Sequence, residues 1–287
     1  MSTRGRVPLA VMLPLRLRSP SPFFDSAGAG VLVSARFGMV LLAVFAASVA
    51  IAQVQNAPAG AHASVPELLV KWTPLLLTSF MFNLLISFFA MLIGTAAGVL
   101  LGFARISLHG PVRGTSWVVV QFFRNAPWLV LLFFVMFLLP FELHIGGRTV
   151  PLPDWIKATF GLALPIMANV AEIVRGAVQS IPTAQWEAAR SLAFSRRRTL
   201  WKIILPQCIK RMLPPWMNWY AILTMATTLA SIVGVSEVMA ITGRITNAEG
   251  RTDLLIPIYT YVLLLFFAYC YPISAWTRRL EARYTER

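Results

Sequence analysis

The sequence predicts an all-α, polytopic membrane protein, and two observations carry that prediction. The chain of 287 residues is 57% hydrophobic with a mean hydropathy of +0.70, and only 13% of its residues are charged. Soluble domains carry about 25% charged residues. The second observation is a series of apolar segments of roughly 18 residues or more, each long enough to cross a bilayer as a helix. Composition therefore favours a single helical membrane domain.

The basic excess sets the expected orientation. A net charge of +14 would suggest nucleic acid as the partner of a soluble chain. Here most Lys and Arg residues fall in segments that one topology places in the cytoplasm, as the positive-inside rule expects. We therefore expect both termini in the cytoplasm and no nucleic-acid partner. In this topology the basic residues on the outer side are Lys71, Arg148, Lys157, Arg244 and Arg251.

The N-terminal region contains a tail and one span. Residues 1–35 are basic and rich in Pro, Ser and Gly, which predicts a flexible cytoplasmic tail. Residues 36–55 contain an apolar run from Phe37 to about Val54, which predicts an extra N-terminal transmembrane helix. A signal peptide with Arg36 as its basic region is the alternative. The 35 residues that precede the run favour a retained anchor.

Five further spans follow a polar linker at residues 55–73. The first of them contains Gly94, Gly98 and Gly102, whose four-residue spacing places three glycines on one helix face and allows close helix packing. Arg124 to Pro127 interrupts the next span. A short cytoplasmic tail, residues 280–287, closes the chain. The predicted spans are residues 75–104, 117–139, 156–178, 212–232 and 254–276.

A charged stretch, residues 185–218, separates two of these spans. We expect a short helix around Glu187, a turn at Ala193-Phe194, and a second helix that Ser195 caps at its N-terminus. Pro206 should break or kink the second helix. Two short helices joined by small residues would form a cytoplasmic knob that can dock into a groove of another protein. A plain basic loop between membrane helices is the alternative.

Motifs for catalysis are absent from the sequence. There is no G-x-x-x-x-G-K-[ST] phosphate loop, and the histidines His62, His109 and His144 have no second ligand at metal spacing. Cys208 and Cys270 lie in or beside hydrophobic segments, so neither indicates a disulfide or a metal site. The chain is therefore not predicted to be an enzyme. If transport is active, another chain must hydrolyse ATP.

Four motifs in order carry a resemblance to a known family. Glu187-Ala188-Ala189, followed by Leu192-Ala193 and Leu205-Pro206, resembles the EAA loop of ABC importer membrane subunits. From about Phe82 to Arg279, the chain resembles the permease subunits of importers of the histidine/glutamine/glutamate type. The other motifs are Phe123-Arg124-Asn125-Ala126-Pro127-Trp128-Leu129, then Ala171-Glu172-Ile173-Val174-Arg175-Gly176, and Thr227-Thr228-Leu229-Ala230-Ser231 with Gly234 and Glu237.

The resemblance implies a type I ABC importer permease fold, with a core of about five helices in residues 75–279 plus the extra N-terminal helix. It implies a coupling loop at about 183–206 that binds ABC ATPase subunits, which would use ATP and Mg; this chain would bind no cofactor. It also implies a second permease subunit, identical or homologous, and an extracytoplasmic amino acid-binding protein. The coupling residues would be Gln185, Glu187, Ala188, Ala189, Arg190, Leu192, Ala193 and Pro206.

Eight residues are candidates for the pathway or its gating. Glu172 and Arg175 are three apart on one helix face, and a structural ion pair is favoured over substrate contact. Arg124 can extend its guanidinium to the inner membrane surface. Alternatively, Arg124, Asn125 and Pro127 can contact the substrate. The hydroxyl residues can bond to backbone carbonyls or face a wet pathway. The candidates are Arg124, Asn125, Pro127, Glu172, Arg175, Thr227, Thr228 and Ser231.

The expected function is translocation of a polar amino acid across the inner membrane, coupled to a separate ATPase. The Arg124-Asn125 pair in the motif of the predicted span 117–139 favours an acidic amino acid or its amide as the substrate. Ala184 and Ala193 stand where the family usually has Gly, and Met225-Ala226 replaces a charged Lys-Asp pair. The alternatives are an ion-coupled secondary transporter or channel, or a membrane scaffold whose basic loop recruits a partner. An ion-coupled carrier usually shows acids within several spans, whereas here only Glu172 qualifies.

Overall fold

The structure is a computed structural model that describes residues 39–40, 42–50, 64–145 and 148–285. The chain divides into two compact units, Met1–Ala47 and Ser48–Arg287. Residues 39–40 and 42–50 are helical, as expected for part of the first span. The remainder of that span and the predicted tail at residues 1–35 lie outside the described residues.

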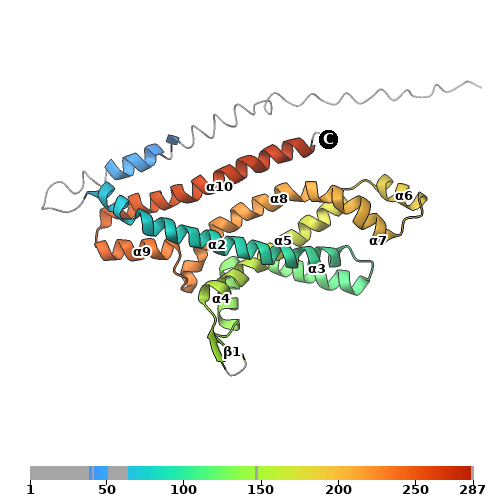
Figure 1. The fold of residues 1–287 in the computed structure, drawn as a ribbon, viewed down its shortest axis with the longest axis horizontal. Helices are drawn as coiled ribbons and strands as arrows, with labels where there is room; N and C mark the ends of the chain where they lie inside the picture. Colours follow the sequence, from blue (N-terminus) through green and yellow to red (C-terminus); the bar gives the residue numbers. More distant parts are fainter. Residues whose placement is uncertain (1–38, 41, 51–63, 146–147, 286–287) are drawn as a thin grey trace, which may run out of the picture. The chain divides into compact units, whose positions relative to one another are not determined.

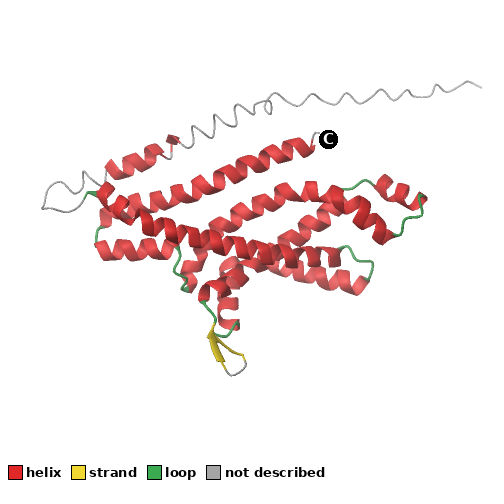
Figure 2. Cartoon of the chain, in the orientation of Figure 1, coloured by secondary structure: helices red, strands yellow, loops and turns green. Residues whose placement is uncertain are grey.

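Helices dominate the second unit (Figures 1 and 2). Three of its described helical segments are long and apolar enough to cross a membrane, and two bent pairs raise the number to five. The elements in chain order are α2 Val65–Arg105, α3 Gly110–Asn125, α4 Trp128–Leu138, β1 Glu142–Ile145, β2 Arg148–Pro151, α5 Asp154–Gln179, α6 Thr183–Ser191, α7 Arg196–Thr199, η2 Leu200–Ile204, α8 Leu205–Ala226, η3 Thr227–Val233, α9 Val238–Glu249, η4 Thr252–Leu254 and α10 Leu255–Thr285.

The helix α2 starts ten residues before the predicted span. Ser64 caps it through a reciprocal capping box with Glu67, whose carboxylate accepts a bond from the Ser64 backbone N–H at 3.0 Å. The prediction that residues 65–73 belong to a linker was therefore wrong. The charged residues Glu67 and Lys71 favoured a polar linker in the sequence analysis, although both are compatible with the end of a long helix.

Three glycines bring α2 against α5, as their spacing predicted. A Cβ atom added to Gly98 would lie 2.7 Å from the Met167 carbonyl oxygen and 2.7 Å from Val170 Cβ. Gly94 and Gly102 meet α5 at similar distances. Side chains at these positions would force the two backbones apart, so the glycine face is what allows this contact.

The third predicted span is two helices. The axes of α3 and α4 differ by 108° across Ala126 and Pro127. Pro127 lacks an N–H and cannot continue the α3 hydrogen bonds, and it restricts the residue before it to an extended backbone. The preceding loop is also shorter than predicted, since α3 already begins at Gly110 with Pro111 in its first turn.

A β-hairpin, which the sequence analysis did not predict, connects α4 to α5. Strands β1 and β2 pair antiparallel, with Glu142 opposite Pro151, and project away from the helices (Figure 2). Lys157 of α5 is fully buried beside it: its Nζ lies 3.5 Å from the centre of the Phe141 ring and 3.4 Å from Asp154 Oδ1. These contacts stabilise the root of the hairpin on α5.

The fifth predicted span is also irregular. It begins at Leu205 as α8, changes to the 3₁₀-helix η3 at Thr227, and turns at Gly234, whose φ of +94° suits glycine. The helix α9 follows after a 52° bend, and it was not predicted. The helix α10 continues to Thr285, so most of the tail expected at residues 280–287 is helical.

Candidate functional site

The helices α6 and α7 form a knob at the opposite end of the second unit from α9 (Figure 1). The turn between them is a Schellman motif: Phe194 N–H donates to the Ala189 carbonyl at 3.0 Å, and Ala193 N–H donates to the Arg190 carbonyl at 2.8 Å. Ala193 has a φ of +58°, the one positive φ of a non-glycine residue in the described part of the chain. Ala193 therefore occupies the left-handed position that was expected for the family's glycine.

The second helix of the knob starts as predicted and ends differently. Ser195 Oγ accepts a bond from the Arg198 backbone N–H at 3.5 Å, which confirms its N-cap role. Pro206, however, does not break the helix. The π-turn η2 immediately precedes it and α8 continues through it, because the wider turn accommodates a residue without an N–H. The segments α7, η2 and α8 thus form one continuous helical lever, which the Schellman turn joins to α6.

The base of the knob packs against the rest of the second unit, and its outer face is exposed. Ala189 is buried, and Trp186 packs against an apolar cluster that includes Ile181, Ile204 and Cys208. A cavity of about 400 Å³ lies between Glu187 and Arg196. None of the ion pairs among the described residues involves Glu187 or Arg190. The exposed members of the predicted coupling set are Gln185, Glu187, Ala188, Arg190, Leu192, Ala193 and Pro206.

A half-buried ion-pair cluster lies next to the knob. Glu172 accepts from Arg175 Nε at 2.6 Å with one carboxylate oxygen, and from Arg105 Nη2 at 2.7 Å with the other. Arg175 also donates to Gln179. The pairing of Glu172 with Arg175 was predicted, whereas Arg105 was interpreted only as the end of a span. Arg196 of α7 donates to the Ile106 carbonyl at 3.4 Å, so the knob touches the residue after Arg105.

A cavity of about 460 Å³, here called the inner cavity, opens beside this cluster. Two of the predicted pathway residues line it, Arg124 and Glu172, together with Arg211 and Trp219 of α8. The indole of Trp219 stacks on Trp128, the first residue of α4, with ring centres 6.4 Å apart. The break at Pro127 thus brings the ends of α3 and α4 to the same cavity.

Asn125, another predicted pathway residue, bonds within its own helix. Its Nδ2 donates to the Gln121 carbonyl within α3 at 2.7 Å. The amide therefore satisfies a carbonyl near the end of its own helix, where no further turn supplies a donor.

Thr227 belongs to a buried polar node between α2, η3 and α9. Asn83 Nδ2 donates to Thr227 Oγ1 at 2.9 Å and to Glu237 Oε2 at 2.8 Å, and all three side chains are fully buried. Glu237 Oε1 caps α9 through the backbone N–H groups of Met239 and Ala240. Glu172 is therefore not the one buried acid of the spans; Glu237 is a second, held as a helix cap.

The other hydroxyls of the predicted set bond to the backbone. Thr228 Oγ1 donates to the Met225 carbonyl at 2.9 Å, and Ser231 Oγ donates to the Thr228 carbonyl at 2.7 Å. Both side chains are half-buried. Of the two alternatives for these residues, the structure shows the backbone bonds.

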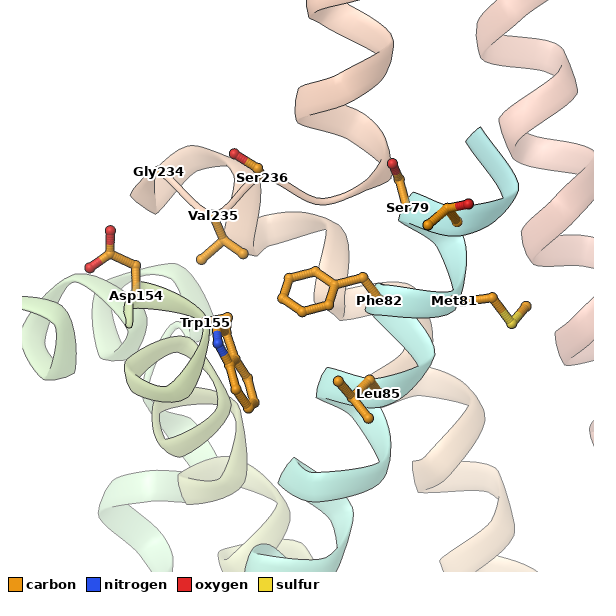
Figure 3. A pocket seen from close by; sticks show the side chains of 10 residues that line it. Ser79, Met81, Phe82, Leu85, Asp154, Trp155, Gly234, Val235 and Ser236 are labelled. Atoms are coloured by element: carbon orange, nitrogen blue, oxygen red, sulfur yellow. The ribbon is translucent and has the colours of Figure 1, made fainter. Parts of the chain in front are cut away.

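A larger cavity of about 760 Å³ lies at the α5 N-terminus (Figure 3). Figure 3 shows Phe82 of α2 and Trp155 of α5 facing each other; their rings make an edge-to-face contact at 5.9 Å. The loop Gly234–Ser236 lines the same cavity. Asn83 Oδ1 accepts a hydrogen bond from the backbone N–H of Val238, which fixes the start of α9 just after this loop. This cavity and the inner cavity lie toward opposite ends of α5.

Comparison with known proteins identifies the family. Residues 94–286 match the family "Binding-protein-dependent transport system inner membrane component". The chain belongs to this family. It is 33% identical over 218 residues to a probable amino-acid ABC transporter permease of Bacillus subtilis, YckA, covering 76% of this chain and 92% of the relative. It is 30% identical to the glutamine transport system permease GlnP of Escherichia coli K12, covering 73% and 93%.

Two solved structures are similar to this chain in fold. An amino acid ABC transporter crystallised with histidines aligns with a TM-score of 0.62 at 24% identity, covering 74% of this chain and 96% of that one. The inward-facing methionine transporter MetNI aligns with a TM-score of 0.53. These alignments confirm the fold of the inner membrane permease. The family match and the relatives confirm the resemblance that the sequence motifs suggested, and the chain is a transport subunit of an ABC system.

Three charged residues of these sites were not predicted as site residues: Arg105, Arg211 and Glu237. Arg105 and Glu237 left a signal, since each is a charged residue at or within an otherwise apolar segment, where charge is costly and indicates a function or a partner. Arg211 gave no such signal, because it lies in a basic stretch where positive-inside bias already accounts for it.

Proposed function

We propose that this permease carries a polar amino acid inward across the inner membrane, with its described knob and its termini on the cytoplasmic side. The amino acid is inferred from the relatives, which are named as amino-acid and glutamine permeases. The observation that carries the proposal is the knob itself: a two-helix projection with a buried base that includes Ala189, exposed Glu187 and Ala188, and a continuous helical connection from α7 to α8.

The ATPase subunits would bind the knob from the cytoplasm. Closure of an ATPase dimer on ATP and Mg would displace α6 and α7, and η2 would pass that displacement to α8 without a flexible joint. Arg211 and Trp219 on α8 line the inner cavity, so motion of α8 changes that cavity. Hydrolysis would then reset the path to the inward-facing state.

Two further partners belong to the proposal. A second permease subunit would complete the translocation path, and the exposed apolar side chains of α4, such as Val130 and Phe134, are available to pack against it. An extracytoplasmic binding protein would deliver the amino acid to the side that carries the β-hairpin. We place Lys71 and Glu249 on that outer side as well; their ion pair of 2.9 Å joins the ends of α2 and α9.

The test is affinity purification of the full chain from its native membrane, followed by identification of the proteins that stay bound. Recovery of a Walker-motif ATPase, and its loss with Glu187→Lys, would support the proposal. Glu142→Lys on strand β1 is the matched control, since it reverses an exposed charge away from the knob. A wild-type chain that purifies without an ATPase, yet transports amino acid with an ion gradient, would overturn coupling in favour of a secondary carrier.

A further inference from the structure

One face of the lever carries exposed side chains whose polarity changes along its length. Arg198 and Lys202 are exposed near the knob, and Trp201 between them is 54% exposed. Ile209 and Leu213 follow along α8 and are 58% and 38% exposed. The spacing of these five residues keeps them on one side of the helix. This exposed face therefore changes from basic to aromatic to apolar over about 22 Å of helix.

This order of side chains is the order in which a helix meets lipid headgroups, the membrane interface and the hydrocarbon. Lys and Arg extend their charged ends toward headgroups, and Trp is enriched at the interface. A soluble protein that covered Arg198 and Lys202 from the cytoplasm would leave the apolar continuation of the same face unexplained. A phospholipid accounts for both parts, because its headgroup is polar and its acyl chains are apolar.

Two other helices have the same combination of residues at the knob end of the second unit. Trp117 of α3 is 50% exposed and follows the exposed Arg113 by one helical turn. Trp276 of α10 is 62% exposed and precedes the exposed Arg279 by one turn. The start of α3, the knob and the C-terminal part of α10 all lie toward this end (Figure 1). Exposed Trp residues next to basic residues on three helices are typical of a membrane interface.

The lever adds a fixed aromatic ring and a second cation to this combination. Trp201 packs on Phe103 of α2, with ring centres 5.6 Å apart, so the indole is held between the lever and α2. Arg198 and Lys202 are four positions apart on the same face, and both can reach one phosphate group. None of the ion pairs of the described residues includes either of them. Two uncompensated cations favour a headgroup with a net negative charge, since a zwitterionic headgroup brings a cation of its own.

From this arrangement we infer that Arg198, Lys202 and Trp201 bind the headgroup of an anionic phospholipid. Its acyl chains follow the apolar residues Ile209 and Leu213 along α8. The inference goes beyond the proposed function and does not need the ATPase. Because the site lies on the lever, a bound lipid holds α7 and η2 at the membrane surface. The mobility of this segment therefore depends on the fraction of anionic lipid in the membrane.

The test is native mass spectrometry of the purified full-length chain in detergent, titrated with phosphatidylglycerol or with phosphatidylcholine of the same acyl chains. Phosphatidylglycerol should bind about tenfold or more tightly. Arg198→Gln/Lys202→Gln should bring the two affinities within about twofold of each other. Arg198→Lys/Lys202→Arg keeps both charges and should retain the preference. Lys71→Gln/Arg148→Gln removes two positive charges from exposed positions elsewhere and should also retain it.

Hydrogen exchange of the same proteins in nanodiscs measures the effect on the lever. Amides of residues 196–204 should exchange more slowly with phosphatidylglycerol present than in phosphatidylcholine alone, and Arg198→Gln/Lys202→Gln should remove this difference. Unchanged affinity of this variant for phosphatidylcholine shows that it is folded.

Two results would overturn the inference: equal affinity of the wild-type chain for the two lipids, or a preference for phosphatidylglycerol that survives in Arg198→Gln/Lys202→Gln. If this variant loses a co-purifying ATPase but keeps its lipid preference, the two basic residues belong to the ATPase interface and the lipid site is wrong.

Discussion

Arg105 Nη2 lies 2.7 Å from Glu172 Oε1 and joins the C-terminal end of α2 to α5, with 9% and 14% of the two side chains exposed. The pair sits between two functional regions. On one side, Arg196 of the knob contacts Ile106; on the other, Glu172 lines the inner cavity. Glu172 is thus linked to the knob through Arg105 and the adjacent Ile106, and it lines the inner cavity itself.

Removing this carboxylate should destabilise the protein. Glu172→Gln leaves two arginines without their acid, and breaking a buried ion pair typically costs about 3–5 kcal/mol. Because the groups here are partly exposed, we expect a decrease in unfolding free energy of about 2–3 kcal/mol. Denaturant titration of the detergent-solubilised chain measures this. Glu142→Gln on the hairpin is the control, and equal stability of the two variants would contradict the structural role of the cluster.

The glycine face of α2 should not tolerate a methyl group. In Gly98→Ala the new Cβ would meet a backbone oxygen at 2.7 Å, and a backbone atom cannot move aside as the end of a side chain can. We expect a loss of about 1–3 kcal/mol. Gly114→Ala in α3 has open space around it and serves as the control, with stability unchanged or slightly increased. If Gly98→Ala melts at the wild-type temperature, the helices are less close than described.

Glycine should stabilise the turn of the knob. Ala193 has a φ of +58°, and a left-handed backbone costs an L-residue about 1 kcal/mol that glycine avoids. Ala193→Gly should therefore raise the unfolding free energy by up to about 1 kcal/mol and preserve transport. Ala184→Gly is the opposite case, since residue 184 is inside α6 and glycine there should cost about 0.5–1 kcal/mol. Melting curves of the two variants measure these opposite changes in stability. A loss of transport in Ala193→Gly would show that the turn needs the methyl group.

The node around Asn83 should be intolerant of an apolar side chain. In Asn83→Leu, Glu237 Oε2 and the Val238 N–H lose their partner in a fully buried site. Each unsatisfied buried group costs about 1–3 kcal/mol. Hydrogen exchange of α9 should report the change, with faster exchange from Val238 onward than in wild type. Asn247→Leu, on an exposed position of α9, is the control. Equal exchange in the two variants would argue against the node as the anchor of α9.

Much of the fold was predictable because helices in a bilayer satisfy their own backbone hydrogen bonds. A long apolar segment is then sufficient evidence for a helix, as for α5 and α10. The boundaries were less predictable. Residues 65–73 carry charge and were assigned to a linker, whereas the capping box at Ser64 shows that α2 already begins there. The hairpin, η3 and α9 are short or irregular, and their residues have no clear period.

Within the candidate site, local chemistry was predictable and distant partners were not. The Ser195 cap, the left-handed Ala193 and the pairing of Glu172 with Arg175 each depend on residues within a few positions. Arg105 is 67 positions from Glu172, and Asn83 is 154 from Glu237. No pattern in one sequence connects residues so far apart.

The sequence by itself determined the membrane class, most of the spans, the two-helix knob and the family, because each depends on composition or on neighbours along the chain. Only the tertiary structure decided that Pro127 separates two helices by 108°, that Pro206 leaves the lever continuous, and that Arg124 and Arg211 share a cavity with Glu172. The physical reason is that these outcomes depend on how helices pack. Helix packing determines whether a helix bends at a proline, and it brings together charged residues that are far apart in the sequence.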